Sequence, residues 1–527
     1  MKRRQFLRNL TVAGSLAPLM LHGYSVQAFQ EHPISDLLIH SECDDRVLVL
    51  VQLNGGNDGL NTVIPIDQYG LYKSARGSIA IPEESILKIS DATGLHPQMQ
   101  GMQSLFKDGK LRILQDVGYP IPNFSHFRST DIWLTGSDTE EYINTGWLGR
   151  YLDTRFPNYP DVYPNPEMSD PLAIQIGSVL SLGFEGPNAN MAMAFTDPNS
   201  YYNIVDGTGN QANTTRADIE LAYIRKIGEQ LQKFANPVKN AASKAKNLSK
   251  LYPAIRTNPL ADQLKIVAQL IAGGLKSKVY MVSLTGFDTH ANQLQGGNGT
   301  PVPHGTLLQQ VSIAIQAFMD DCSLLGIEDR VLGMTFSEFG RRIKVNSSSG
   351  TDHGAAGPVF LFGSSVESGI HGHNPIIPQD PGPDDNIPMQ TDFRSLYASI
   401  LKQWFCIPPS ELKKITIHDF AYDIPIVKNG VSNIAELGIQ DESFVTISPN
   451  PVNSQAIITW NASFPISRIT LYNNIGSYIG TLADSFTYHQ TEISIRVDHL
   501  PKGYYIVQLS SIHGKYSLKI SYYSIVV

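Results

Sequence analysis

The sequence predicts an α/β fold, a mostly parallel sheet sandwiched by helices, followed by a small all-β domain. Apolar runs of strand length, such as Val47–Leu53, show almost no alternation, which is typical of strands buried on both faces of a parallel sheet. Helical patterns lie between these runs, and short links join strand, helix and strand. From Phe444 onward the helical patterns stop and short alternating strands remain.

The predicted elements of the α/β domain follow one another in order. The strands are predicted at Val47–Leu53, Leu111–Gln115, Val279–Leu284, Val331–Phe336 and Val359–Phe362. Asn258 is a predicted N-cap for a helix over Pro259–Leu275, and His304–Leu325 places apolar residues at helical spacing. Arg216–Asn247 also has a helical pattern, whereas Pro375–Pro388, rich in proline and aspartate, is predicted to be a loop.

Polar residues follow several of these strands directly. Asn54 and Asp58 come after the first strand, Asp288 and His290 after the third, and Glu338 after the fourth. Ligands of such sheets bind at the carboxyl ends of the strands, so the sequence predicts a site at this edge.

Two Asp/His pairs give this site its chemistry. One pair is Asp288 and His290, within Thr-Gly-Phe-Asp-Thr-His, and the other is Asp352 and His353, within Thr-Asp-His-Gly. Carboxylate oxygen supplies charge and imidazole nitrogen supplies a directional lone pair, so the two pairs together are typical of a metal site. Residues two apart in an extended segment face the same way, so Asp288 and His290 can reach one ion.

The N-terminus predicts export. Residues 1–28 combine a basic start, an apolar stretch over about Leu10–Leu21 and the small-residue cleavage site Val26-Gln27-Ala28. The apolar stretch is too short to span a bilayer, which takes about 20 residues. Arg3-Arg4 followed by Phe6-Leu7 resembles a twin-arginine signal, and a general secretory signal is the alternative.

Charge and cysteine content limit the binding partners and the disulfides that the sequence predicts. Removing residues 1–28 takes away four basic residues and no acid, so the formal net charge moves from −8 to −12. A protein this acidic is a poor binder of nucleic acid or anionic membranes. Cys43, Cys322 and Cys406 are widely spaced and predict no disulfide framework, and Cys322 is predicted to lie in the core.

Residues 444–527 are predicted to form a β-sandwich without catalytic clusters. Its strands are predicted at Ala456–Trp460, Ile469–Tyr472, Ile493–Val497, Tyr504–Leu509 and Tyr516–Ile520. The segments Ser448-Pro449-Asn450-Pro451 and Gly503-Tyr504-Tyr505-Ile506-Val507, then a lysine-bearing final strand, resemble the C-terminal sorting domain of type IX secretion substrates. The resemblance implies passage across an outer membrane, with release or cell-surface attachment. A generic adhesive module is the alternative.

The main domain, predicted over 29–430, resembles a known family through a series of motifs. They are Asn54-Gly55-Gly56-Asn57-Asp58-Gly59-Leu60-Asn61, Gly94-Leu95-His96-Pro97, Phe124-Ser125-His126-Phe127, Gly146-Trp147-Leu148-Gly149-Arg150, Glu338-Phe339-Gly340-Arg341 and Thr351-Asp352-His353-Gly354. Over residues 45–410 the chain is similar to the bacterial family called domain of unknown function 1501. Through Asp352-His353-Gly354 it resembles the wider alkaline phosphatase/sulfatase superfamily.

That resemblance implies an alkaline phosphatase-like fold and a set of metal ligands. Asp352 and His353 match the superfamily's late pair, and Asp288 and His290 match the preceding pair. His373 follows at a distance where the superfamily often has a last ligand, although a solvent-exposed loop histidine is the alternative. The implied cofactor is a divalent ion, Zn, Ca, Mg or Mn.

The first ligand position departs from the superfamily pattern. Asn54 stands where a carboxylate is expected, so either Asn54 binds through its carbonyl oxygen or Asp58 replaces it. The charge at this corner, and with it a second metal, is therefore in doubt.

The nucleophile that the resemblance implies is Ser125, before a helical stretch. There a hydroxyl meets free backbone N–H groups, although a serine that only caps the helix is the alternative. His126 is expected to assist and Arg128 to hold a phosphate or sulfate. Arg341, close to Glu338, is as readily interpreted as half of a structural ion pair.

These expectations combine into one predicted function. The protein is expected to be an exported, metal-dependent hydrolase of a phosphate or sulfate ester, in a small molecule or a glycan. The common sulfatase motif, Cys/Ser-x-Pro-x-Arg, is not found, which favours phosphate or an unfamiliar ester. The alternative is a cell-surface binding or structural protein that keeps the fold without catalysis, as Asn54 suggests.

Overall fold

The computed structural model describes residues 43–198, 233–295 and 303–428, and most of the C-terminal strands between 445 and 522. The predicted signal peptide and the first half of the predicted helix 216–247 lie outside the described residues, whereas residues 233–244 are helical as predicted. Among the described helices, none combines the length and the apolar character that crossing a membrane requires.

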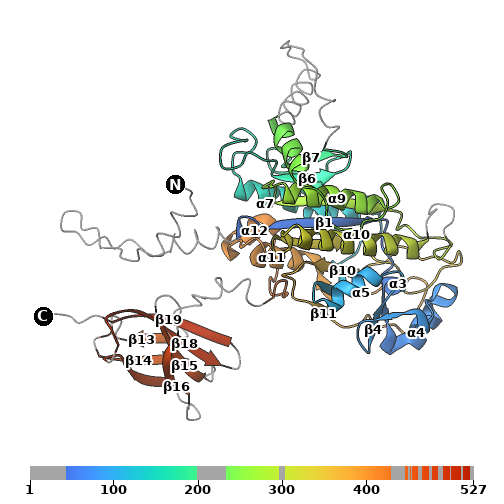
Figure 1. The fold of residues 1–527 in the computed structure, drawn as a ribbon. Coiled ribbons are helices and arrows are strands. Elements are labelled where there is room, and N and C mark those ends of the chain that lie inside the picture. The colour runs from blue at the N-terminus through green and yellow to red at the C-terminus, as the bar shows by residue number, and fades with distance from the viewer. Residues whose placement is uncertain are drawn as a thin grey trace. The chain divides into compact units, whose positions relative to one another are not determined.

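A mixed, mostly parallel sheet forms the centre of the α/β domain (Figure 1). Within the described residues it contains β11, β5, β10, β9, β1, β8, β6 and β7 in that order, with β12 paired to β5. Their bounds are β1 Val47–Asn54, β5 Leu111–Gly118, β6 Ala173–Ile176, β7 Ala192–Phe195, β8 Val279–Thr285, β9 Val331–Phe336, β10 Gly357–Phe362, β11 Gly369–His371 and β12 Thr391–Asp392. The predicted fold class is confirmed.

Only β10 runs against its neighbours, since it pairs antiparallel with both β5 and β9. All the other pairs in the sheet, including β1 with β8 and β9, are parallel. The start of β10 therefore lies at the same edge as the carboxyl ends of β1, β5, β8 and β9.

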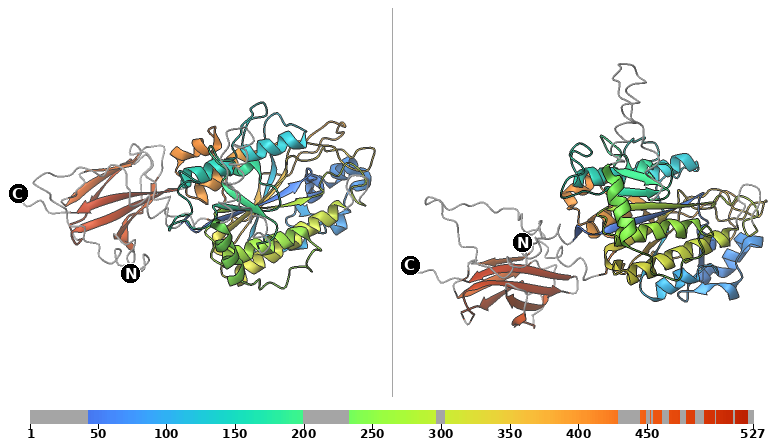
Figure 2. Two further views of the ribbon diagram at one scale, coloured as in Figure 1. Left: turned by 90° about the horizontal axis from the view of Figure 1, so that it is seen from above. Right: turned by 45° about the horizontal axis from the view of Figure 1, so that its top comes forward.

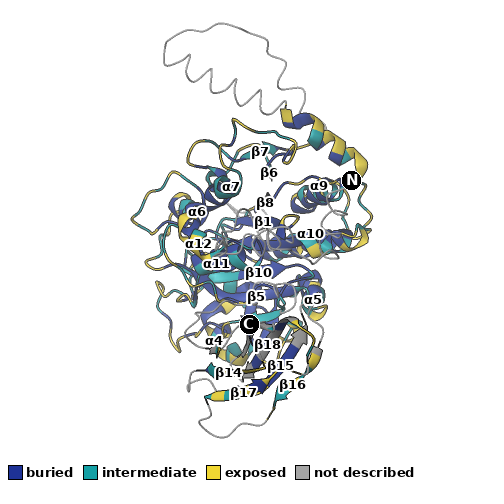
Figure 3. Ribbon diagram, turned by 90° about the vertical axis from the view of Figure 1, so that its left-hand side faces the viewer, coloured by how far each residue is buried: buried dark blue, intermediate teal, exposed yellow. Residues whose placement is uncertain are grey.

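Helices cover both faces of the sheet, as Figures 2 and 3 show from other directions. One face carries α5 (Gln100–Lys107), α9 (Pro259–Ala272) and α10 (His304–Leu324). The other carries α6 (His126–Thr135), α7 (Trp147–Arg155), α11 (Phe393–Gln403) and α12 (Pro409–Thr416). Because both faces are covered, the residues of β1 before Asn54 are buried, which explains their unbroken apolar run.

Local sequence signals account for the helix ends. Asn258 caps α9 as predicted, since its side chain accepts a hydrogen bond from the Ala261 N–H at 3.1 Å, and Pro259 occupies the first turn. Helix α10 matches its predicted range to within one residue, and Cys322 is buried and unpaired within it, as expected.

A smaller subdomain follows β1. It contains α3 (Gly59–Thr62), α4 (Tyr69–Arg76) and an antiparallel sheet of β2 (Val63–Pro65), β4 (Thr93–Leu95) and β3 (Leu87–Lys88). Several of its buried residues, among them Ile64 and Tyr72, belong to an apolar cluster separate from the main core, and this cluster also includes Ile343 and Ile387.

The prediction of no disulfide framework is wrong in one respect. Cys43 and Cys406 form a disulfide, with their Cα atoms 6.2 Å apart and a sequence separation of 363 positions. Sequence spacing could not reveal this pair, because the fold brings the start of β1 beside the segment after α11. Disulfides are typical of oxidising compartments outside the cytosol.

The C-terminal region forms two antiparallel sheets. One contains β13 (Val445–Ser448), β14 (Gln455–Trp460) and β17 (Glu492–Arg496); the other contains β16 (Tyr478–Ala483), β15 (Ile466–Asn473), β18 (Gly503–Ser511) and β19 (Gly514–Tyr522). Their inward residues, including Ile458, Ile469 and Val507, form one apolar core. The predicted all-β class is confirmed, while β13 and β16 were not predicted as strands.

Candidate metal centre

Four chain segments meet at the edge of the sheet where the parallel strands end. His126 begins α6, which follows β5, and Asp288 and His290 follow β8. Glu338 lies two residues after β9, and His353 lies shortly before the antiparallel β10. The topology therefore brings together residues that are more than 200 positions apart in the sequence.

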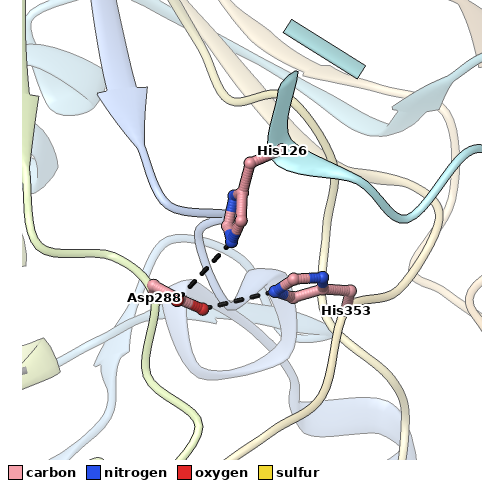
Figure 4. A group of neighbouring side chains, drawn as sticks. All are labelled: His126, Asp288 and His353. Atoms are coloured by element: carbon pink, nitrogen blue, oxygen red, sulfur yellow. Dashed lines mark hydrogen bonds and ion pairs between the residues drawn. The ribbon is translucent and has the colours of Figure 1, made fainter. Parts of the chain in front are cut away.

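Three imidazole rings surround the carboxylate of Asp288. His126 Nε2 lies 3.5 Å from Oδ2, and His290 Nε2 and His353 Nε2 lie 3.2 and 3.3 Å from Oδ1. Figure 4 shows His126 and His353 directed at Asp288 from two different chain segments. His290 Nε2 is also 2.9 Å from His353 Nε2. Nitrogen and oxygen atoms that can each bind a metal are therefore gathered in one place.

The opposite nitrogen of two rings is bonded to a carboxylate. His126 Nδ1 lies 2.8 Å from Glu338 Oε1, and His290 Nδ1 lies 2.9 Å from Asp352 Oδ1. An ionised carboxylate only accepts hydrogen bonds, so each Nδ1 must carry the proton. In the neutral form of each ring the Nε2 lone pair is then free to bind a cation, which is the usual arrangement of histidines that bind metals, whereas a doubly protonated ring donates from Nε2 to Asp288.

His353 is held in the same way by a backbone carbonyl. Its Nδ1 donates to the Phe124 carbonyl oxygen at 2.7 Å, and Phe339 packs against its ring with centroids 4.4 Å apart. The same Phe339 ring lies 4.9 Å from that of His126. Hydrogen bonds and packing thus fix the orientation of the rings.

Arg341 supports the site from beneath. Its buried guanidinium donates to Asp288 Oδ1 at 2.7 Å and to the carbonyls of Thr351 at 2.7 Å, Gly56 at 2.7 Å and Gly55. It does not form the ion pair with Glu338 that the sequence suggested, because Glu338 accepts hydrogen bonds from His126 and the Gly55 N–H instead.

The glycines after β1 are required by this packing. Gly55 and Gly56 have φ of 121° and 79°, in the region that favours glycine. A Cβ on Gly55 would lie 2.3 Å from the Asp288 nitrogen, and one on Gly56 would lie 2.3 Å from the Phe339 ring. The glycine-rich turn therefore allows the backbone of the β1 loop to approach the site.

The electrostatics favour an ionised Asp288. Burial acts to raise the pKa of this carboxyl, but hydrogen bonds from His290, His353 and Arg341 outweigh it and hold the pKa well below its ordinary value. The pKa of His126 is raised chiefly by its hydrogen bond to Glu338, and that of His290 chiefly by its hydrogen bond to Asp288.

Asp352 contacts the ring of His290 at Nδ1, the nitrogen opposite the one that contacts Asp288. Burial acts to raise its pKa, but hydrogen bonds from Asn346, at 3.1 Å, and His290 lower it. In the structure Asp352 orients His290, while His353 next to it faces Asp288, and the ligand role of Asp352 stays a prediction.

Asp58 is placed outside this group. Its carboxylate is fully buried and receives two hydrogen bonds from Arg76, at 2.8 and 2.9 Å. A charge already neutralised in this way is a poor metal ligand, so the predicted metal role of Asp58 gives way to a structural ion pair. Asn54 ends β1 at the correct edge, opposite Thr285 of β8, and its ligand role stays a prediction.

The structure also changes the expected roles near α6. Arg128 is buried, and its guanidinium is engaged by the segment after α6: Nε and Nη2 donate to the carbonyl of Thr139, Nη2 donates to those of Asp138 and Glu141, and the guanidinium stacks on Tyr142. These contacts replace its expected hold on a substrate anion with a structural role.

Ser125 occupies the N-cap position of α6, but its side chain makes no capping hydrogen bond. Its hydroxyl is exposed and lies one residue before His126. The structure therefore does not support the interpretation of Ser125 as only a helix cap, and its catalytic role stays a prediction.

His373 lies elsewhere, in the loop after β11. Its Nδ1 contacts the Asn374 carbonyl at 2.9 Å, and its backbone is bonded to Gln390, which in turn bonds Asp116. None of these partners belongs to the group around Asp288, so the solvent-exposed alternative fits His373 better than the ligand role.

A second group, Asp138, Glu141 and His418, also brings possible ligand atoms together. His418 Nε2 lies 3.1 Å from Glu141 and 3.7 Å from Asp138, but Arg394 already forms an ion pair with Asp138. A cation would gain little binding energy from an exposed carboxylate that already pairs with an arginine. The group around Asp288 is therefore the stronger candidate for a metal site.

Sequence reasoning missed three roles at the site. His126 was expected to assist a nucleophile, although its ring lies in the group around Asp288, and Glu338 and Arg341 were not expected to contact His126 and Asp288. The signal for His126 was its place at the start of a helix after β5, beside the candidate Ser125. Glu338 and Arg341 gave only the weaker signal of charged residues after a buried strand.

Comparisons with known proteins agree with the sequence resemblance. Residues 205–405 match the family model described as "Protein of unknown function (DUF1501)", and residues 446–522 match the "Secretion system C-terminal sorting domain". No curated protein matches the chain. The sorting domain indicates export to the cell surface or secretion.

Several solved structures are similar to this chain at low TM-scores. The PsFucS1 sulfatase from Pseudoalteromonas sp. is 10% identical, covers 90% of this chain and 87% of its own, and has a TM-score of 0.32. A protein in the alkaline phosphatase superfamily from Vibrio parahaemolyticus is 8% identical, covers 93% and 88%, and scores 0.29. The alkaline phosphatase from the Antarctic bacterium TAB5 is 10% identical, covers 61% and 92%, and scores 0.28.

Scores this low carry no argument about activity, and the fold class is established by the strand order of the sheet itself. The predicted family resemblance is confirmed by the family models: the chain carries a domain of unknown function 1501 match in its α/β region and a type IX secretion sorting domain at its C-terminal end.

Proposed function

We propose that the protein is an exported, metal-dependent hydrolase of a phosphate or sulfate ester. Asp288, His126 and His353 would hold the ion, and His290 would supply a further donor. The observation that carries this proposal is the set of three rings whose Nε2 atoms meet at one carboxylate while each Nδ1 is bonded to a carboxylate or carbonyl.

The spacing of the donor atoms supports a small ion. Ligands 2.0–2.1 Å from a tetrahedral ion lie about 3.3 Å from one another. The measured contacts among the donors of Asp288 and the three rings lie between 2.9 and 3.5 Å. A donor set rich in imidazole favours zinc or a similar transition metal over calcium or magnesium, which prefer oxygen.

The chain's own residues then divide the work. A bound ion would neutralise charge on the ester and lower the pKa of an attacking O–H group. Ser125, exposed and without a capping bond, is the proposed nucleophile, since it adjoins His126 in the chain. Glu338 and Asp352 keep two rings in the tautomer that binds metal, and Asn54 remains a proposed oxygen donor at the end of β1.

A second candidate is a metal-holding surface protein without ester hydrolysis. It is favoured by the contacts of Arg128, which was expected to hold the substrate anion, and of Arg341, the arginine bonded to Asp288. Arg128 faces carbonyls of its own loop, and Arg341 is buried against Asp288. An anionic ester would thus depend on the metal, rather than on these guanidinium groups, for its binding.

The test begins with the metal content of natively exported protein, measured by mass spectrometry. We expect near-stoichiometric metal in the unchanged protein and little in Asp288→Ala/His353→Ala. His418→Ala, in the second group of possible ligands, is the matched control and should keep its metal. Well-folded protein without metal would reject the proposal.

Asp352→Asn separates a ligand from a residue that orients one. An asparagine keeps the shape but weakens the hold on His290, so metal affinity should fall by about 10- to 100-fold. Complete loss of metal would restore Asp352 as a ligand. If metal binds but no phosphate or sulfate ester is hydrolysed, the second candidate is the better description.

A further inference from the structure

Gln293 lies between the two chain segments that carry the candidate ligands. We name residues 288–290 the first ligand segment and residues 351–353 the second. Gln293 is buried, and its Oε1 accepts hydrogen bonds from Thr289 Oγ1 at 3.1 Å and from Thr351 Oγ1 at 2.9 Å. One amide oxygen thus holds one hydroxyl from each ligand segment.

The other end of the same side chain is anchored to a buried ion pair. Gln293 Nε2 donates to Asp58 Oδ2 at 2.6 Å, and Asp58 is bonded twice to Arg76. Because a carboxylate only accepts and both hydroxyls have Oε1 within reach, the amide has a single orientation that satisfies all its partners. Gln293 therefore cannot flip without placing its amide oxygen against the Asp58 carboxylate, which can only accept.

The backbone reinforces this arrangement. The Gln293 N–H donates to the Ser349 carbonyl at 2.9 Å, and the Thr351 N–H donates to the Thr289 carbonyl at 3.0 Å, which joins the two ligand segments directly. Thr289 is buried, whereas its neighbours Asp288 and His290 are only partly buried. Thr289 therefore contacts Gln293 while Asp288 and His290 contact each other at the candidate metal site.

We propose that Gln293 is a positioning residue that sets the separation of the two ligand segments and so the metal affinity of the site. In the described contacts the Gln293 side chain touches neither Asp288 nor any of the three rings around it, and it acts through the two threonines. The inference rests on the proposed metal centre. It also gives Asp58 a function, since the Asp58–Arg76 pair fixes Gln293 rather than the metal.

Gln293→Met tests this inference, because methionine has a similar volume but makes none of the three side-chain hydrogen bonds. In the full chain, we expect the dissociation constant for zinc to rise by about 10- to 100-fold, as for residues that orient ligands. We also expect a changed absorption spectrum after cobalt loading. A loss of stability alone does not move the cobalt spectrum of the folded fraction.

Gln263→Met is the matched control. Gln263 also braces backbone next to the site, since it exchanges hydrogen bonds with Ser283 of β8 at 2.8 and 3.0 Å, but it contacts neither threonine. It should leave the zinc affinity and the cobalt spectrum unchanged. Unchanged values in folded Gln293→Met would overturn the inference.

Thr351 offers a second test if Gln293→Met does not fold. Thr351→Val removes one hydroxyl at nearly constant shape and should weaken zinc binding several-fold, whereas Thr351→Ser keeps the hydroxyl and should restore it. Equal zinc affinity in the valine and serine variants would contradict the inference. If the unchanged protein binds no metal, the proposed function fails and this inference fails with it, whereas metal bound equally by all variants overturns the inference alone.

Discussion

Asp58 and Asp288 follow neighbouring strands and both are bonded to arginine, yet their surroundings differ. They come after β1 and β8, which pair in parallel with Asn54 opposite Thr285. The Asp58 side chain is 0% exposed, and that of Asp288 is 45% exposed. Asp58 is bonded by groups that do not change their charge at ordinary pH, whereas Asp288 is surrounded by imidazoles.

The difference shows how an aspartate can either form a structural ion pair or act as a candidate metal ligand, depending on its surroundings. A buried carboxylate that accepts three hydrogen bonds from a guanidinium and an amide has its charge balanced and little acceptor capacity left for a ligand, so its role is to stabilise the fold. A half-exposed carboxylate among rings with converging Nε2 atoms keeps the ability to share a cation with them. Gln293 joins the two regions, so the buried pair supports the open site.

The largest expected effect concerns the buried region. Arg76→Met leaves the Asp58 carboxylate buried without its cation, so we expect the free energy of unfolding to fall by about 3–5 kcal/mol. Urea unfolding measures this loss. Arg155→Met, which removes an ion pair with the exposed Asp44, is the control and should cost about 0–1 kcal/mol. Equal losses in the two variants would show that Asp58 does not depend on Arg76.

The second prediction uses the histidines near Asp58. Burial lowers the pKa of His304 to about 4 and that of His96 to about 3. Asp58 opposes the shift of His304, while Arg76 and Arg341 add to it. Because the unfolded chain binds these protons more readily, stability is fully present above the ordinary histidine pKa of about 6.5 and falls as the pH drops toward 4.

His304→Gln removes one of these two titrations. Between pH 7 and pH 4 we expect the variant to lose about 3 kcal/mol less of its unfolding free energy than the unchanged protein. Urea unfolding across this pH range is the measurement. Val311→Ala, on the same helix, should lower stability by a similar amount at each pH, and a pH dependence of His304→Gln equal to that of the unchanged protein would contradict the assignment.

The fold was predictable because its signals are local. The buried runs of β1 and β9 and the Asn258-Pro259 start of α9 each record their own surroundings in a short stretch of sequence. The Cys43–Cys406 disulfide was not predictable, since it depends on two chain segments meeting after folding.

The site was predictable in its location and in part of its membership. Asp288, His290 and His353 were expected as ligands, and the structure brings all three together. Asp58 and Asp288 could not be told apart, because exposure and hydrogen-bond partners come from distant residues such as Arg76. No sequence spacing links His126 to Glu338, which lie 212 positions apart.

The smallest expected effect on stability belongs to Ser125, which lies in the partly exposed region of Asp288 and His126. Its side chain makes no capping bond, whereas Asn258 caps α9. Ser125→Ala should therefore change the free energy of unfolding by less than about 0.5 kcal/mol, and Asn258→Ala should cost about 1 kcal/mol.

If Ser125 is the nucleophile, Ser125→Ala will keep its metal and lose ester hydrolysis, which assays of metal content and turnover measure together. A stability loss as large as that of Asn258→Ala would instead return Ser125 to the role of a helix cap, because a hydroxyl that carries only chemistry contributes nothing to the unfolding equilibrium.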